Sequence, residues 1–213
     1  MALNVITTEY AEAASALIMR GLAHYRLASA PLALTVSRSP AGRLHASLRL
    51  PGRIQHASPL GEHDAIVRAV AVAEDFSLAR LTQTTEALLP RERLFEAMWK
   101  TELRQAADTW PRRLDAWKRL HDIRIEAKFP WRFALLGFIQ ARNSIAHGLG
   151  SLTRKQLVDR DKTESLLQAA GIGLRGDTLV LGPEHVDSCA HVMAVFIDWL
   201  DVKASLRVRD FVG

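Results

Sequence analysis

The chain has 213 residues, of which 48% are hydrophobic and 24% charged, and its formal net charge is +5. This composition excludes a disordered or fibrous chain, and the single cysteine, Cys189, excludes both an internal disulfide and a cysteine-rich zinc site. No apolar run approaches the roughly 18 residues of a membrane span and no secretion signal stands at the N-terminus, so we expect a cytoplasmic protein with no membrane contact.

The first part of the chain differs in pattern from the rest. Its alanine- and leucine-rich spacing predicts a helix over 10–27, and two short apolar segments predict a hairpin with strands at 32–36 and 44–50. The second strand alternates apolar and polar residues, which is the period of a half-buried strand. Prolines and glycines follow the hairpin. We therefore predict an N-terminal helix-and-hairpin appendage over 1–58 and a helical bundle over 59–213.

The second part is predicted to be helical, which makes the fold class mainly α. Prolines divide it into segments that each have helical spacing, and a small hairpin precedes the last of them. The predicted elements are helices over 65–89, 91–110, 111–123, 131–147, 153–170 and from 183 onward, with the hairpin within 172–181. The helix over 131–147 is apolar nearly all round, so we expect it in the middle of the bundle.

The C-terminal end of that helix carries the strongest candidate site. Arg142, Asn143 and His147 stand there, followed by Gly148 and Gly150, which are expected to end the helix. Arginine holds phosphate through donors that stay charged, and histidine transfers protons near neutral pH. At 100° per residue, Asn143 and His147 share a face, whereas Arg142 lies roughly 140° from His147. A substrate would reach both only across this edge or with a second copy of the helix.

The arginine–histidine spacing also arises by chance in a chain with 22 arginines and 8 histidines. Two further pairs, Arg38 with His45 and Arg49 with His56, fall in the hairpin and its exit and have no helical context. For the third pair, the alternative to a site is an arginine at the surface and a histidine that interacts with the last carbonyls of the helix.

Arg142-Asn143-x-x-x-His147-Gly148, at the end of an apolar helix and before a predicted capping box at 153–156, resembles the active-site element of the HEPN superfamily. The resemblance covers about residues 62–205. Members are all-α bundles with an arginine, a polar residue directly after it, and a histidine after four to six intervening positions. The segment 1–58, the residues around 108–130 and the hairpin near 175–178 are additions to a minimal HEPN bundle.

The resemblance implies a metal-independent endoribonuclease, without a cofactor, that acts as a homodimer in a toxin–antitoxin or antiviral defence system. RNA would be the substrate, and an antitoxin or another defence-system protein would be a further partner. His147 would be the acid/base residue, Arg142 would hold the phosphate, and Asn143 would orient both. Some HEPN proteins are catalytically silent, so an adaptor that dimerises and binds a protein, a nucleotide or RNA is the alternative.

A second candidate site precedes the motif helix. Residues 110–132 hold seven basic side chains against three carboxylates, a net charge of +4, with four aromatic residues interleaved. Aromatic rings stack on unpaired bases while cations follow the backbone. This predicts RNA contacts by Arg112, Arg113, Lys118, Arg119, Arg124, Lys128 and Arg132. The alternative is an amphipathic helix with its tryptophans inside and its arginines in solvent. No metal site is predicted.

Overall fold

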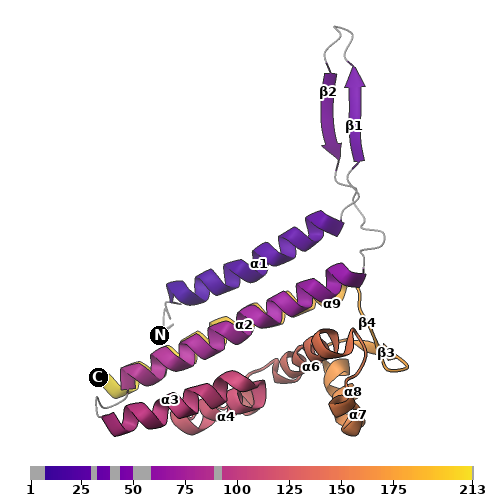
Figure 1. The fold of residues 1–213 in the computed structure, drawn as a ribbon. Helices are drawn as coiled ribbons and strands as arrows, with labels where there is room; N and C mark the ends of the chain where they lie inside the picture. Colours follow the sequence, from indigo (N-terminus) through magenta and orange to yellow (C-terminus); the bar gives the residue numbers. More distant parts are fainter. Residues whose placement is uncertain (1–7, 30–32, 39–43, 50–58, 89–92, 213) are drawn as a thin grey trace.

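The computed structural model describes residues 8–29, 33–38, 44–49, 59–88 and 93–212. Over these residues the protein is mainly α, as the sequence predicts, with two separate two-stranded antiparallel sheets (Figure 1). Its elements are α1 (Glu9–Ser29), β1 (Ala33–Arg38), β2 (Leu44–Arg49), α2 (Pro59–Leu88), α3 (Arg93–Asp108), α4 (Trp110–His121), α5 (Ile125–Lys128), α6 (Arg132–Gly148), α7 (Arg154–Val158), α8 (Arg160–Ala169), β3 (Gly173–Arg175), β4 (Thr178–Val180) and α9 (Pro183–Val212).

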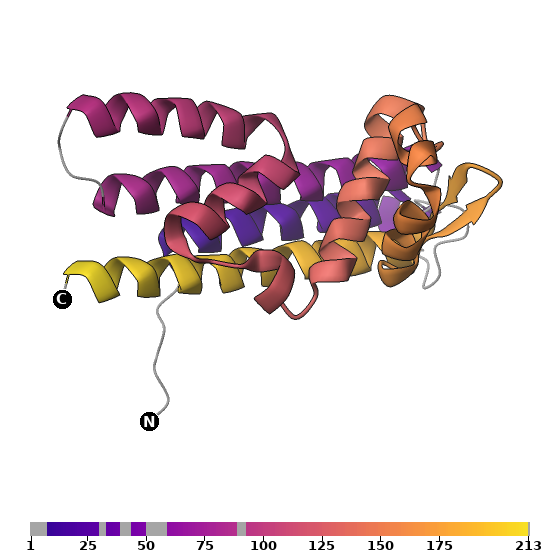
Figure 2. The same ribbon diagram turned by 90° about the horizontal axis from the view of Figure 1, so that it is seen from below.

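The helices form three layers (Figures 1 and 2). α2 and α9, each 30 residues long, lie side by side in the middle layer and run in the same direction. α1 covers one side of this pair, and the helices from α3 to α8 lie on the other side. α6, which carries the candidate site, therefore packs directly against the central pair of helices.

α1 packs against both central helices and shares their core. Its buried residues recur three or four positions apart, as a single apolar face requires: Ala11, Ala14, Ile18, Leu22 and Tyr25. β1 and β2 pair as the predicted hairpin, from Ala33–Arg49 to Arg38–Leu44. The turn between these strands and the domain boundary near residue 58 lie outside the described residues, so the division into two domains stays a prediction.

The helices differ from the prediction at several points: α2 begins at Pro59 rather than at residue 65, and the short helix α5 was not expected. The helix expected over 153–170 is two helices, because Asp159 between α7 and α8 has a non-helical backbone (φ −112°, ψ 50°). The chain leaves α6 through Leu149, whose left-handed conformation (φ 52°) falls between the two glycines expected to end the helix. Because a side chain with a Cβ rarely adopts this conformation, the exit from α6 stores backbone strain of about 1 kcal/mol or more.

His121, the last residue of α4, is buried and electrically neutral. Its Nε2 lies 2.7 Å from Thr85 Oγ1, and that hydroxyl donates its own hydrogen to the Leu81 carbonyl. Nε2 therefore carries the ring hydrogen, and Nδ1 has no hydrogen-bond partner within the described chain. Burial lowers the pKa of His121 to about 4, and the charge of Arg207 acts in the same direction.

This histidine predicts a loss of stability in mild acid. Unfolded His121 takes up a proton near pH 6.5, whereas folded His121 stays neutral down to about pH 4, so the unfolded state binds more protons between these values. We expect the free energy of unfolding to fall across this window by roughly 3 kcal/mol, measured by urea denaturation. His121→Gln should flatten this pH dependence, and His24→Gln, at an exposed position of α1, should retain it. Equal slopes for the parent and His121→Gln would contradict the assignment.

Candidate functional site

α6 lies between the central helix pair and α8 (Figure 2). Its close approach to α8 depends on Gly137, because a Cβ at this position would collide with the Leu166 carbonyl oxygen and lie 2.8 Å from the Ala170 Cβ. Five apolar residues of α6 fill the core: Ala134, Leu135, Phe138, Ile139 and Ala141. The position and tilt of α6 are thus fixed on two sides.

α7 anchors the C-terminal half of α6 through Gln156. The predicted capping box is confirmed, since Thr153 and Gln156 exchange side-chain-to-backbone hydrogen bonds at the start of α7. Gln156 Nε2 also donates to the Gln140 carbonyl (2.9 Å), and Ser144 Oγ donates to Gln156 Oε1 (3.0 Å). A short helix too small to be stable alone therefore holds the end of α6 through buried polar contacts.

The chain after the candidate site is fixed by the second hairpin. The Leu179 N–H donates to the Gly150 carbonyl, and the Leu152 N–H donates to the Asp177 carbonyl, both at 2.8 Å. Gly150, with φ of 90°, lies so close to the His63 ring that a Cβ there would come within 2.9 Å of it. The last turn of α6 and the residues after it are therefore held in place by α7, by the β3–β4 hairpin and by His63 of α2.

The three predicted site residues are placed as follows. Arg142 Nη1 donates to Asn143 Oδ1 (3.3 Å), and the Arg142 side chain is 28% exposed. His147 is exposed and has no hydrogen bond or ion pair with any part of the chain that the structure describes. No hydrogen bond joins Arg142 to His147. The structure thus brings Arg142 together with Asn143 and leaves His147, which shares the face of Asn143, open to solvent.

Arg142 also faces a carboxylate that the sequence did not single out. Glu74 of α2 lies with Oε2 3.8 Å from Arg142 Nη2, and its Oε1 accepts a hydrogen bond from Arg113 Nη1 at 3.2 Å. Arg113 is only 1% exposed, and its guanidinium lies over the Trp110 ring. Burial lowers the pKa of Arg113 while Glu74 raises it. These contacts join residues far apart in sequence, so no local spacing signals them.

The basic segment divides into paired and unpaired cations. Arg113 is buried, so its position does not fit the predicted contact with RNA. Arg112, Arg119 and Arg124 form ion pairs with carboxylates on or beside their own helices. For Lys118, Lys128 and Arg132, no ion pair occurs with the described residues. Among the interleaved aromatic residues, three are buried and one is exposed: Trp110, Trp117 and Phe129 inside, Trp131 at the surface.

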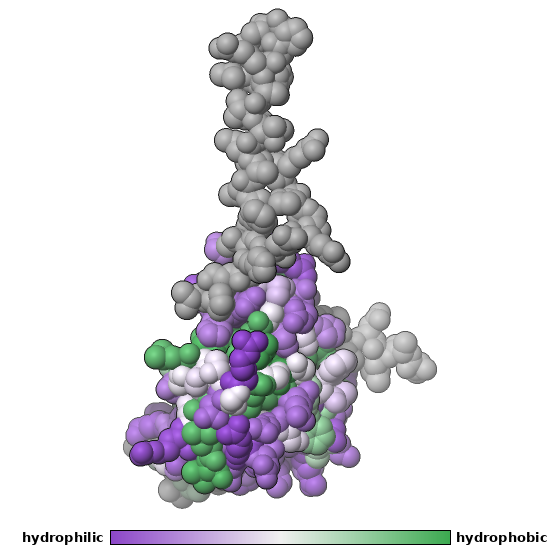
Figure 3. Space-filling view, turned by 90° about the vertical axis from the view of Figure 1, so that its right-hand side faces the viewer, coloured by the Kyte–Doolittle hydropathy of each residue, from purple (hydrophilic) through white to green (hydrophobic). Residues whose placement is uncertain are grey.

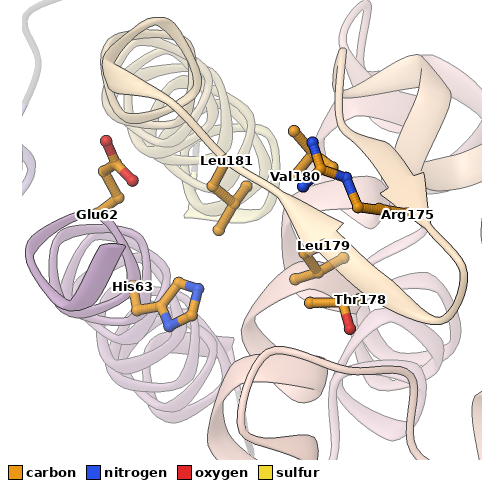
Figure 4. A pocket seen from close by; sticks show the side chains of 7 residues that line it. All are labelled: Glu62, His63, Arg175, Thr178, Leu179, Val180 and Leu181. Carbon is orange, nitrogen blue, oxygen red and sulfur yellow. The ribbon is translucent and has the colours of Figure 1, made fainter. Parts of the chain in front are cut away.

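A hollow of about 360 Å³ lies at the same end of the molecule, between the first turns of α2 and the hairpin β3–β4 (Figure 4). Its lining is Glu62, His63, Arg175, Thr178, Leu179, Val180 and Leu181. The His63 ring points toward the hollow, and burial lowers the pKa of this histidine. Two widely separated segments meet here, so the sequence pattern did not indicate the hollow.

The surface around this end is mixed, with apolar areas between hydrophilic ones (Figure 3). Exposed apolar residues occur two positions after His147, in α7 and in β4: Leu149, Leu157, Val158 and Val180. Such a surface, partly apolar and rimmed by polar groups, is typical of protein contacts.

No protein-family model matches the chain, and searches of curated proteins and of solved structures also give no match. Within the described ranges, no group of three or more His, Cys, Asp or Glu side chains is arranged to hold a metal ion. No helix of that same part is both long and apolar enough to cross a membrane.

Proposed function

We propose that this protein is a metal-independent endoribonuclease of the HEPN type, with its active site at the C-terminal end of α6. The observation that carries the proposal is an exposed histidine that has no partner among the described residues, five residues after an arginine whose guanidinium donates a hydrogen bond to Asn143. An open imidazole and a positioned cation, brought to the same phosphodiester, suit proton transfer and charge stabilisation there.

The reaction would be an internal transesterification of RNA. The ribose 2′-oxygen forms a bond to the adjacent phosphorus while the bond from phosphorus to the 5′-oxygen breaks. His147 accepts the proton from the 2′-hydroxyl and passes a proton to the departing 5′-oxygen. Arg142 stabilises the charge on the phosphoryl oxygens. The products are a 2′,3′-cyclic phosphate and a 5′-hydroxyl.

A homodimer would bring the arginine of one chain to the histidine of the other. Arg142 and His147 lie roughly 140° apart around α6, so one chain alone does not present both to a single phosphate. The apolar side chains of Leu149, Leu157 and Val158 near this end of the molecule support a contact between two copies. A role in a toxin–antitoxin or antiviral system, and an antitoxin-like partner, follow from the HEPN resemblance and belong to the same proposal.

The test is RNA cleavage in excess chelator. We expect the parent to cut single-stranded RNA and leave cyclic phosphate ends, and we expect Arg142→Ala and His147→Ala each to reduce the rate at least about 100-fold. Arg104→Ala and His24→Ala, at exposed helical positions elsewhere, are the matched controls and should keep the parent rate. Circular dichroism checks that all variants fold.

Mixing the two inactive variants tests the shared site. If each site takes groups from two chains, a mixture of the Arg142→Ala protein and the His147→Ala protein should regain part of the activity. The mixed dimers contain one site with an intact arginine from one chain and an intact histidine from the other. Activity per molecule should also rise with concentration as dimers form. A strictly monomeric, fully active parent would contradict the composite site.

A catalytically silent adaptor is the second candidate. It is favoured by the contact of Arg142 with Glu74, since an arginine already held by a carboxylate has less charge to offer a phosphate. For a silent adaptor, we expect dimerisation, and we expect the parent, Arg142→Ala and His147→Ala all to cleave RNA only at the background rate. The chelator assay therefore separates the two functions.

A further inference from the structure

One face of α6 stays at least partly exposed along the whole helix, although the sequence favoured burial all round. At 100° per residue, its five residues fall within an arc of roughly 80°: Phe133, Leu136, Gln140, Asn143 and His147. We call this face the α6 stripe. It begins beside α5 and ends at the proposed catalytic histidine.

Two aromatic side chains are exposed at the N-terminal end of the stripe. Trp131 is 48% exposed and Phe133 is 54% exposed, whereas Trp110, Trp117 and Phe129 of the same region are buried. The rings of Trp131 and His191 of α9 are perpendicular and pack edge to face, with their centroids 5.8 Å apart. The Arg132 guanidinium carbon lies 4.5 Å from the centroid of the Phe133 ring. Two large aromatic rings in solvent, two positions apart in the chain, are suited to a binding surface.

The charge around these rings is positive and available. Lys128 is exposed, Arg132 is partly exposed, and neither makes an ion pair within the ranges that the structure describes. This contrasts with Arg112, Arg119 and Arg124 of the preceding segment, each of which faces a carboxylate at 2.9 Å or less. Within residues 124–132, the cations left open to a polyanion are therefore those nearest in sequence to the two exposed rings.

We propose that an unpaired stretch of single-stranded RNA binds along the α6 stripe, with bases stacked on Trp131 and Phe133 and phosphates near Lys128 and Arg132. The inference rests on the proposed endoribonuclease function and names its substrate class. Rings with adjacent cations suit a strand whose bases are free to stack and whose backbone is anionic. If a second copy of the chain bound this part of the stripe across a two-fold axis, Lys128 and Arg132 would lie near the same residues of the other copy. Repulsion between these like charges disfavours a second copy here.

The length of the stripe sets the size of the substrate. Phe133 and His147 are separated by 14 residues, roughly 21 Å along the helix axis. RNA that reaches both must extend several nucleotides from the bond that is cut. Binding energy from the stacked bases would then position the distant phosphate at His147, so short fragments should be cleaved more slowly than longer strands.

Binding is tested with the full chain and an unstructured 2′-O-methyl RNA oligonucleotide, which lacks the attacking hydroxyl. Fluorescence anisotropy should show that Trp131→Ala and Phe133→Ala each weaken the affinity by roughly tenfold. Arg132→Ala should reduce the slope of log affinity against log salt by about one. Arg104→Ala is the control cation on α3 and should leave affinity within about twofold. Intrinsic tryptophan quenching by the oligonucleotide should vanish in Trp131→Phe while stacking affinity largely persists.

The outcomes distinguish this inference from the function on which it rests. Normal affinity in both aromatic variants, or equal binding of a fully double-stranded RNA, would overturn it. So would variants that convert a dimer to a monomer in light scattering without changing RNA affinity, because the stripe would then be a contact between copies. His24→Ala, at an exposed position of α1, should bind as tightly as the parent. If binding follows the aromatic variants but no protein cleaves RNA, the inference stands and the catalytic proposal fails.

Discussion

Replacing Asp201 by asparagine is expected to lower the free energy of unfolding by about 3–5 kcal/mol. Asp201 is fully buried in α9, where its carboxylate accepts hydrogen bonds from the Thr8 backbone N–H (2.8 Å), Thr8 Oγ1 (2.9 Å) and Arg80 Nε (2.8 Å). Arg80 belongs to α2 and is itself 8% exposed. An amide has the same shape but no charge, and its NH₂ group faces donors, so Arg80 would stay buried without its counter-ion.

A matched control stands one turn earlier on the same helix. Asp198 is exposed and accepts a hydrogen bond from Ser15, and partial desolvation raises the pKa of its carboxyl group. Asp198→Asn should therefore change stability by less than about 1 kcal/mol. Urea denaturation of both variants at neutral pH gives the comparison. Similar losses for the two substitutions would show that the three contacts at Asp201 do not hold α1, α2 and α9 together as described.

Local patterns in the sequence predicted most of the elements but fewer of their ends. Prolines and apolar spacing placed the long helices and both hairpins, because these signals act within a few residues. The break at Asp159 carries no glycine or proline. Gln156 and Thr163 on either side of it are both buried, and Thr163 Oγ1 donates a hydrogen bond to the Gln156 carbonyl, a contact across the break that no local spacing signals. Leu149, between the two glycines, adopts the left-handed conformation. We attribute this to the hydrogen bond between the Gly150 carbonyl and the Leu179 N–H of β4, which fixes the path of the chain after α6.

The candidate site was predictable only in part. The face shared by Asn143 and His147 follows from helix geometry alone, and His147 is indeed exposed at the end of α6. The environment of Arg142 was not predictable, because Glu74 lies 68 positions earlier in the chain. Charge counting also misplaced Arg113, since net charge does not say which guanidinium turns inward. Phe133 reads as core and is exposed for the same reason: burial is decided by the neighbouring helices.

Glu74→Gln is the second substitution with a large expected effect, a loss of about 3–5 kcal/mol in the free energy of unfolding. Arg113 has few means of compensating its charge, because its Nη2 donates only to the Ala107 carbonyl (3.3 Å) and its Nε has no partner among the described residues. Removing the Glu74 charge leaves a cation that is 1% exposed without its closest counter-ion. The control pair is Arg160 with Glu164, which is 42% and 35% exposed, and Glu164→Gln should cost less than about 1 kcal/mol.

Arg113→Met should cost much less than Glu74→Gln, because it removes the buried charge together with the need to compensate it. Glu74 is 21% exposed and still faces Arg142 in that variant, so its carboxylate keeps both a cation and some solvent. The free energy of unfolding of the double variant should then be close to that of Arg113→Met alone. The loss in the double variant is therefore expected to be much smaller than the sum of the two single losses. Urea denaturation of the four proteins measures this cycle, and additive losses would contradict a buried pair. RNA cleavage by Arg113→Met should stay near the parent rate, whereas Glu74→Gln should alter it, since only the second change takes away the carboxylate that faces Arg142.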